Sequence, residues 1–223
     1  MDWTAIALSL RLAALVSLIL LVLGPPIAYW LTFSARRWKF LVEAVVALPL
    51  VLPPTVLGFY MLVAFGTRSP LGRAWEGWTG HPLAFTFEAL VIASILYSLP
   101  FSVQPMASSF SQVDRTLLEA SATLGAGRLR TFVSVIAPSL LPPVITGFAL
   151  AFARAIGEYG SIVFISGNLP FKTEIAPYLI VIRLEEFDIP GALALAVVLL
   201  VFSFVLLAVI NVLEQWAGKF AKG

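Results

Sequence analysis

The sequence predicts an all-α integral membrane protein that forms a single domain over residues 1–223, and three observations support this fold class. Of the 223 residues, 60% are hydrophobic and only 12% are charged, whereas a soluble domain is about 45–50% apolar and about a quarter charged. The mean hydropathy is +0.99. The apolar residues also fall into five long stretches. This composition excludes a water-soluble enzyme, a disordered chain and a nucleic-acid-binding arm.

Each apolar stretch has the length of about 20 residues that a helix needs to cross the hydrocarbon core of a bilayer. Backbone amides in lipid must pair within the segment, so each stretch should be α-helical. We predict five membrane spans, at residues 12–33, 41–65, 83–105, 132–156 and 191–213.

Prolines interrupt two of the predicted spans. The second span contains Pro49, Pro53 and Pro54, and proline removes a backbone donor and clashes with the preceding turn. We therefore expect this span to be kinked or locally unwound. Prolines also stand at the start of the fourth span. Such a helix either lines a path that changes shape or is kinked for static packing, and the sequence leaves both interpretations open.

Basic residues predict the orientation in the membrane, because cytoplasmic loops carry an excess of Lys and Arg. One set of loops holds eight of them, at positions 36, 37, 39, 115, 128, 130, 219 and 222. The opposite set holds five, at positions 11, 68, 73, 172 and 183. We expect a multi-pass membrane protein with its N-terminus outside and its C-terminus inside.

The sequence offers no group for covalent or metal chemistry. It has no cysteine and one histidine, so thiolate and multi-histidine metal sites are excluded. It also lacks a Gly-x-x-x-x-Gly-Lys-Ser/Thr phosphate loop and the His-Glu-x-x-His and Gly-x-Ser-x-Gly motifs. We expect no catalytic residue, no metal, no cofactor and no nucleic-acid partner, and any ATP-driven work must come from another subunit.

The longest predicted cytoplasmic segment, residues 111–131, reads as two short helices joined by a glycine bend. Leu117, Leu118 and Leu124 recur at helical spacing, and Gly125 stands where a left-handed C-cap would end the first helix. A second short helix would begin at Arg128. From these residues alone, an amphipathic helix lying on the membrane surface explains the pattern equally well.

The same segment resembles a motif of binding-protein-dependent ABC importer permeases. Residues 119–125 read Glu-Ala-Ser-Ala-Thr-Leu-Gly, and residues 135–138 read Val-Ile-Ala-Pro. The family pattern is Glu-Ala-Ala, three residues, Gly, nine residues and Ile-x-Leu-Pro, with small or apolar departures here at Ser121, Val135 and Ala137. The resemblance implies a type I ABC importer permease fold and a coupling loop that docks on the ATPase. Its coupling residues would be Glu119, Ala120, Ser121, Leu124, Gly125 and Pro138.

Other stretches resemble two sister groups within that family. Residues 48–58 are similar to the second span of molybdate permeases of the ModB type, while residues 167–175 and 183–188 are closer to sulfate and thiosulfate permeases of the CysT type. The resemblance implies import of an oxyanion, molybdate or tungstate, with sulfate or thiosulfate as the alternative. It also implies a second permease copy, two ATPase subunits and an extracytoplasmic binding protein. The resemblance further implies a location in the cytoplasmic membrane of a prokaryote.

Charged and hydroxyl groups inside the spans are the candidates for the anion path. Arg154 and Glu158 are four residues apart, so they share a helix face and can pair. Such charges usually face the bundle interior. Arg154 either attracts the anion while Glu158 positions it, or the two form a structural ion pair. The hydroxyls of Thr55, Ser98 and Ser102 could donate to an oxyanion or bond to helix carbonyls.

Three other classes of membrane protein remain as alternatives. A channel or secondary transporter working alone would not need the segment between Glu119 and Gly125. An intramembrane enzyme lacks any supporting motif. A structural membrane protein would leave the proline-rich second span unexplained. Retention of an ATPase subunit on purification distinguishes the permease from a channel or secondary transporter.

Overall fold

The computed structural model describes residues 2–112, 121, 123–125, 127–131 and 137–220, and throughout these residues the regular structure is helical. The helices are α1 Trp3–Phe33, α2 Lys39–Val51, α3 Pro54–Phe65, α4 Pro70–Thr79, α5 Phe87–Ser111, α7 Arg128–Thr131, α8 Ala137–Ile156, α9 Ala176–Glu185 and α10 Ile189–Phe220.

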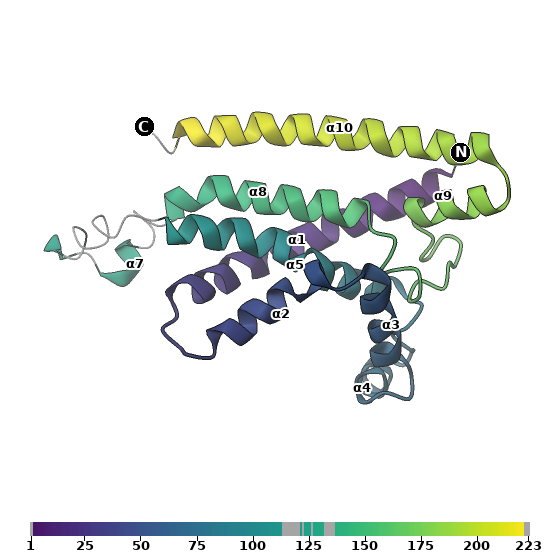
Figure 1. The fold of residues 1–223 in the computed structure, drawn as a ribbon, viewed down its shortest axis with the longest axis horizontal. Helices are drawn as coiled ribbons and strands as arrows, with labels where there is room; N and C mark the ends of the chain where they lie inside the picture. The colour runs from purple at the N-terminus through teal and green to yellow at the C-terminus, as the bar shows by residue number, and fades with distance from the viewer. Residues whose placement is uncertain (1, 113–120, 122, 126, 132–136, 221–223) are drawn as a thin grey trace.

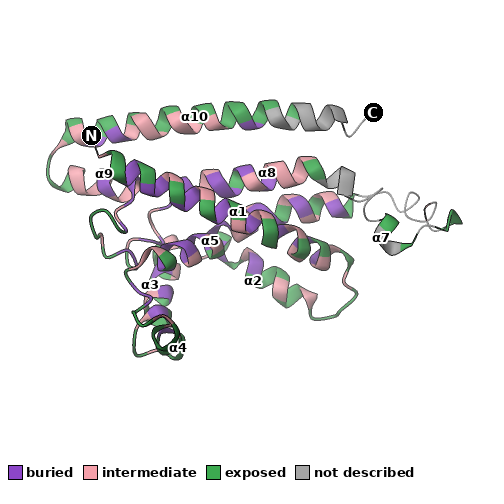
Figure 2. Cartoon of the chain, turned by 180° about the vertical axis from the view of Figure 1, so that it is seen from behind, coloured by how far each residue is buried: buried purple, intermediate pink, exposed green. Residues whose placement is uncertain are grey.

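Helices α1, α5 and α8 form the centre of the molecule and make most of the contacts between elements with one another. Helix α10 runs along α8 and α9, and α2 packs against α5. Figure 2 shows the buried residues gathered on the central helices, whereas α10 is exposed along most of its length. The bundle has two ends, which we call the α7 end and the α9 end (Figure 1).

Small residues allow the three central helices to approach closely. Apolar side chains gain little by leaving lipid, so helices in a membrane associate through close van der Waals packing, which small residues permit. Here small buried residues recur every fourth position, which places them on one face of each helix. They are Ala5, Ser9, Ala13 and Ser17 on α1; Ser94, Ser98 and Ser102 on α5; and Gly147, Ala151 and Ala155 on α8.

The central helices converge at Ser102. Its Oγ donates to the carbonyl oxygen of Leu20 on α1 at 3.3 Å. A Cβ atom on Gly24 of α1 would lie 2.6 Å from that same Oγ, and one on Gly147 of α8 would lie 2.8 Å from the Ser102 carbonyl oxygen. Both glycines are therefore needed for this packing distance.

The second predicted span is two helices rather than one. Helices α2 and α3 meet at an angle of 115°. Leu52 and Pro53 between them are extended, with ψ of 135° at both. Proline disfavours the helical conformation in the residue before it, and the adjacent Pro53 and Pro54 impose this on two residues in succession. The expected local unwinding is confirmed.

The remaining predicted spans overlap the other long helices, with shifted ends. Helix α1 begins at Trp3 rather than at residue 12, and α5 runs on to Ser111 rather than residue 105. Among the described residues, α1, α5 and α10 are long and apolar enough to cross a membrane, and the α2–α3 pair counts as a fourth if it is one span. The apolar part of α8, Leu141–Ile156, is shorter. Five crossings therefore remain a prediction.

Two short helices lie in segments that were expected to be loops. The first turn of α4 is capped by Ser69, whose Oγ accepts from the Gly72 amide at 2.8 Å, and Gly80 ends the helix with a φ of 78°. Helix α9 has a proline in its first turn. Both starts carry ordinary helix-initiation signals.

We predict that Gly147→Val destabilises the permease, because its side chain would overlap the α5 backbone at Ser102. Gly77→Val is the matched control: Gly77 is also inside a helix, but a Cβ there meets nothing within 4 Å, so the change in helix propensity is the same. The excess destabilisation should be about 1–3 kcal/mol, read as a lower midpoint of thermal unfolding in detergent. Equal midpoints for the two variants would contradict the close-packing argument.

Candidate functional site

Arg154 and Glu158 form a buried ion pair where α8 ends. Arg154 Nη2 lies 2.8 Å from Glu158 Oε2. The Glu158 side chain is 1% exposed and that of Arg154 is 22% exposed. The pairing expected from their spacing of four residues is confirmed, although Glu158 lies two residues beyond the last residue of α8.

The surroundings of Arg154 favour its charge. It stands in the last turn of α8, where a cation interacts favourably with the negative end of the helix dipole. Its guanidinium carbon lies 3.9 Å from the centre of the Tyr97 ring and 6.0 Å from that of Phe101, both on α5. A guanidinium over an aromatic face gains a cation–π interaction that strengthens when water is excluded.

Glu158 is also held by the loop that follows it. The backbone amide and the Oγ of Ser161 both donate to Glu158 Oε1, at 2.9 and 2.7 Å. Bonds to the ionised carboxylate stabilise its charged form in a buried setting. The pair is thus a network of α5, α8 and the loop after α8.

That loop packs directly on the broken helix. A Cβ on Gly58 of α3 would overlap the carbonyl oxygen of Ser161, and a Cβ on Gly160 would lie 2.7 Å from Pro54 Cβ. The first turns of α3 therefore rest on the backbone that holds Glu158. The sequence analysis missed Tyr97, Ser161 and Gly58. The sequence signal that could have indicated the Ser161 contact is its short spacing from Glu158, with glycines on either side of Glu158.

None of the three predicted path hydroxyls hydrogen-bonds to this pair among the described residues. Ser98 and Ser102 are fully buried in the packing of α1, α5 and α8. Ser102 bonds to the Leu20 carbonyl, whereas the Ser98 Oγ has no hydrogen-bond partner in the described part of the chain. Thr55 is exposed in the first turn of α3. Only Arg154 and Glu158, of the five predicted path residues, are shown in contact with each other.

Part of the predicted coupling segment is described, and that part lies at the α7 end. Gly125 has a φ of 72°, which confirms the expected left-handed bend, and a helix begins at Arg128 as expected. The hydroxyls of Ser121 and Thr131 are 3.0 Å apart, and Leu124 is 86% exposed. Pro138 lies in the first turn of α8. Glu119 and Ala120 lie outside the described residues.

A cluster of charged side chains lies at the α9 end. Arg183 of α9 lies 2.8 Å from Asp2, 3.3 Å from Asp188 and 3.8 Å from Glu186. The Asp2 carboxylate raises the pKa of Arg183 through a hydrogen bond and its charge. Burial raises the pKa of Glu174 nearby, and the charge of Asp2 adds to this. The cluster ties the start of α1 to α9.

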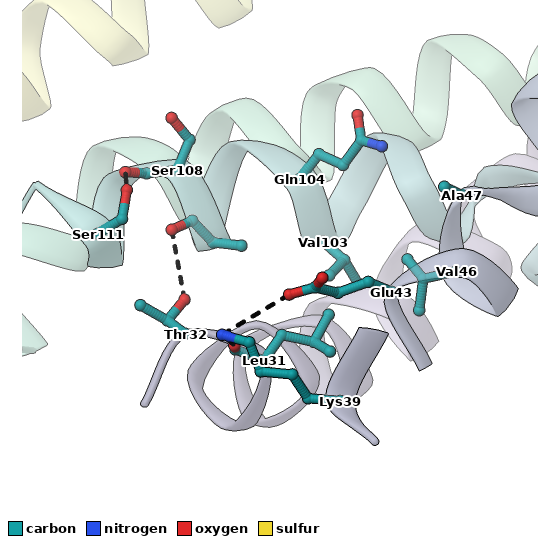
Figure 3. Close-up of a pocket in the computed structure, with 11 residues that line it drawn as sticks. Leu31, Thr32, Lys39, Glu43, Val46, Ala47, Val103, Gln104, Ser108 and Ser111 are labelled. Carbon is teal, nitrogen blue, oxygen red and sulfur yellow. Dashed lines mark hydrogen bonds and ion pairs between the residues drawn. The ribbon is translucent and has the colours of Figure 1, made fainter. Parts of the chain in front are cut away.

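Two surface cavities have mixed linings. One of about 450 Å³ lies between α1, α2 and α5 at the α7 end (Figure 3). In it, Lys39 Nζ donates to the Leu31 carbonyl at 3.1 Å and lies 3.8 Å from Glu43 Oε1. The other, of about 680 Å³, includes Arg11, Glu88 and Lys172 at the α9 end. Because acids and bases face each cavity together, we assign no ligand to either.

Known proteins are similar to this chain in both sequence and fold. Residues 24–219 match the family described as binding-protein-dependent transport system inner membrane component. The molybdenum transport system permease protein ModB of Azotobacter vinelandii is 45% identical, covering 92% of this chain and 91% of the relative. The sulfate transport system permease protein CysT of Synechocystis is 38% identical, covering 90% of this chain and 70% of the relative.

A solved structure of the MetNI methionine ABC transporter, in inward-facing conformations, superposes with a TM-score of 0.72 at 16% identity, covering 96% of this chain and 94% of that one. At this identity the likeness concerns the fold, which is that of a type I ABC importer permease. With the family match spanning most of the chain, the protein belongs to the family of binding-protein-dependent transport system inner membrane components.

Proposed function

We propose that the protein is the permease subunit of an ABC importer that carries molybdate, and also tungstate, across the cytoplasmic membrane. The assignment of the substrate rests on the 45% identity to a molybdenum permease over nearly the full length of both chains. Sulfate or thiosulfate is the second candidate, supported by 38% identity to a sulfate permease.

In this proposal the subunit is not an enzyme, and ATP hydrolysis belongs to a separate ATPase. The working complex holds two copies of the permease, two ATPase subunits and an extracytoplasmic binding protein. The coupling surface is the α7 end, where the exposed Leu124 and the Gly125 bend are available for docking. The family resemblance adds four further residues to this coupling surface, namely Glu119, Ala120, Ser121 and Pro138.

Uptake by the reconstituted complex tests the substrate. Vesicles that contain the permease, its ATPase and its binding protein should accumulate radioactive molybdate only with ATP, and excess tungstate should compete while excess sulfate should not. Sulfate accumulation would establish the second candidate instead. Accumulation by the permease alone would identify a channel or secondary transporter.

The orientation we propose places the α7 end in the cytoplasm and the α9 end outside. The fold brings residues 34–40 and α7 to the same end (Figure 1), so the described parts of these two basic loops lie together in space. The positive-inside bias supports a cytoplasmic position for this end.

Single cysteines test this orientation without background, because the chain has none. In intact cells, an impermeant thiol reagent should label Thr79→Cys, and it should label Ser34→Cys and Ser111→Cys only after the membrane is opened. Labelling of Ser111→Cys from outside would rule the orientation out.

Gly125→Val should uncouple the permease from its ATPase. A β-branched residue at a φ of 72° is strained by about 1–2 kcal/mol, so the bend should distort. We expect weaker retention of the ATPase and reduced uptake, with normal membrane insertion. Gly127→Val is the matched control, since Gly127 lies two residues away without a positive φ and a Cβ there meets nothing within 4 Å. If both variants keep the ATPase equally well, the bend is not part of the docking surface.

We propose that Arg154 and Glu158 line the anion path, with Thr55 near its mouth, while Ser98 and Ser102 contribute chiefly to helix packing. Arg154→Gln alone should strand a buried carboxylate, at a cost of about 3–5 kcal/mol, and reduce the amount of assembled complex. The double variant with Glu158→Gln removes both charges and should restore assembly.

Uptake by that double variant separates two roles. A path role predicts restored assembly with molybdate uptake still impaired. Full recovery of uptake together with assembly would show that the two residues form a structural pair only.

A further inference from the structure

The two carboxylate oxygens of Glu158 are held unequally. Oε1 accepts two aligned hydrogen bonds from Ser161, at 2.9 and 2.7 Å. Oε2 lies 2.8 Å from Arg154 Nη2 as an ion pair, yet it accepts no aligned hydrogen bond from the described residues. Glu158 is thus held by Ser161 through one oxygen and by Arg154 through the other. The contact to Arg154 joins opposite charges, so it is the one for which a competing anion can substitute.

Arg154 is the accessible member of the pair. Its side chain is 22% exposed and that of Glu158 is 1% exposed, so an anion arriving from outside would reach the guanidinium first. Tyr97 covers the face of the guanidinium at 3.9 Å, which leaves the N–H groups at its edge as donors. A guanidinium edge is suited to bidentate contact with an oxyanion. In the present structure Glu158 Oε2 occupies that position.

The loop that holds Glu158 also supports α3. Gly58 lets α3 approach so closely that a Cβ there would overlap the Ser161 carbonyl oxygen, and Pro54 meets Gly160 in the same way. Helix α3 is joined to α2 only through the extended Leu52 and Pro53, at an angle of 115°. A displacement of Ser161 therefore reaches the helix that adjoins the break between α2 and α3.

We propose that Glu158 occupies the position on Arg154 where the transported oxyanion binds, so that the two exchange during transport. Ser161 and Gly58 are positioning residues that link this exchange to the angle between α2 and α3. This inference rests on the proposed oxyanion transport. A tetrahedral dianion displaces Oε2 from the guanidinium. Glu158 then has no counter-charge in a buried setting, which is unfavourable, so it moves toward water with Ser161, and the loop leaves Gly58.

Ser161→Ala tests the link without removing a charge. It deletes the 2.7 Å hydroxyl bond to Glu158 and keeps the backbone bond. Ser161→Thr restores a hydroxyl and should restore the behaviour of the natural protein. The matched control is Ser166→Ala, another fully buried serine of the same loop, whose Oγ accepts from the Asn168 amide at 3.2 Å.

Two measurements are made on the complete complex in vesicles. The first is the ratio of ATP hydrolysis with molybdate-loaded binding protein to hydrolysis without it. The second is the distance between spin labels at Val45→Cys on α2 and Val63→Cys on α3, which are 66% and 59% exposed, with and without trapping by ATP and vanadate.

Loss of one hydrogen bond to a charged acceptor shifts an equilibrium by about tenfold or more. For Ser161→Ala we therefore expect a lower ratio of ATP hydrolysis with loaded binding protein to hydrolysis without it. Before trapping, the distances between the two spin labels should already be shifted toward those of the trapped complex. Ser161→Thr and Ser166→Ala should match the natural protein. An unchanged ratio and distribution in Ser161→Ala overturns the proposal, as does an equal effect of Ser166→Ala.

The outcome for the natural protein separates this inference from the proposed function. If the complex imports no molybdate, the function is wrong, while the trapping experiment, which needs no oxyanion, still reports whether Ser161 controls the α2–α3 angle. If molybdate is imported and Ser161→Ala behaves normally, only the inference fails.

Discussion

Close approach of α1, α5 and α8 is the constraint on which the rest of this structure depends. In a bilayer the apolar side chains gain little by leaving lipid for protein, so helices are held by packing contacts that act over short distances. At Ser102 those contacts involve backbone atoms, because Gly24 and Gly147 have no side chains to keep the helices apart. The central unit is therefore tightly packed, whereas α3 and α10 lie outside it.

The same packing explains how a charge pair is tolerated at the end of α8. A buried ion pair is favourable only when its geometry is good and its remaining polar atoms are satisfied. Tyr97, presented by α5, covers the guanidinium, and Ser161 satisfies one carboxylate oxygen. Neither residue is adjacent to Arg154 in sequence. The pair thus depends on α5 and α8 being fixed relative to each other.

Local patterns in the sequence predicted local geometry well. A glycine after a helical segment predicted the left-handed turn at Gly125, and a spacing of four predicted the contact of Arg154 with Glu158. Local patterns did not show which of the three Pro-Pro pairs, at residues 25–26, 53–54 and 142–143, would interrupt a helix. Those at residues 25–26 and 142–143 lie inside continuous helices, and only Pro53–Pro54 separates two helices. Helices α1 and α8 pack against each other and against α5, and that tertiary packing is not visible in the sequence. Tyr97 and Gly58 were missed for the same reason, since each acts on a residue far away in the chain.

Helix α8 gives the proposed transport cycle a physical connection between its two ends. Its 20 residues span about 30 Å at 1.5 Å per residue, and Arg154 lies in its last turn. In the proposed cycle, a displacement at the α7 end is carried to Arg154 by α8, which packs against α1 and α5. Helix α3 packs on α4 and α5, but it is joined to α2 by two extended residues. In the proposed cycle, movement from the α7 end reaches the place where α3 rests on the Glu158 loop, which is also where the accessible Arg154 meets Glu158.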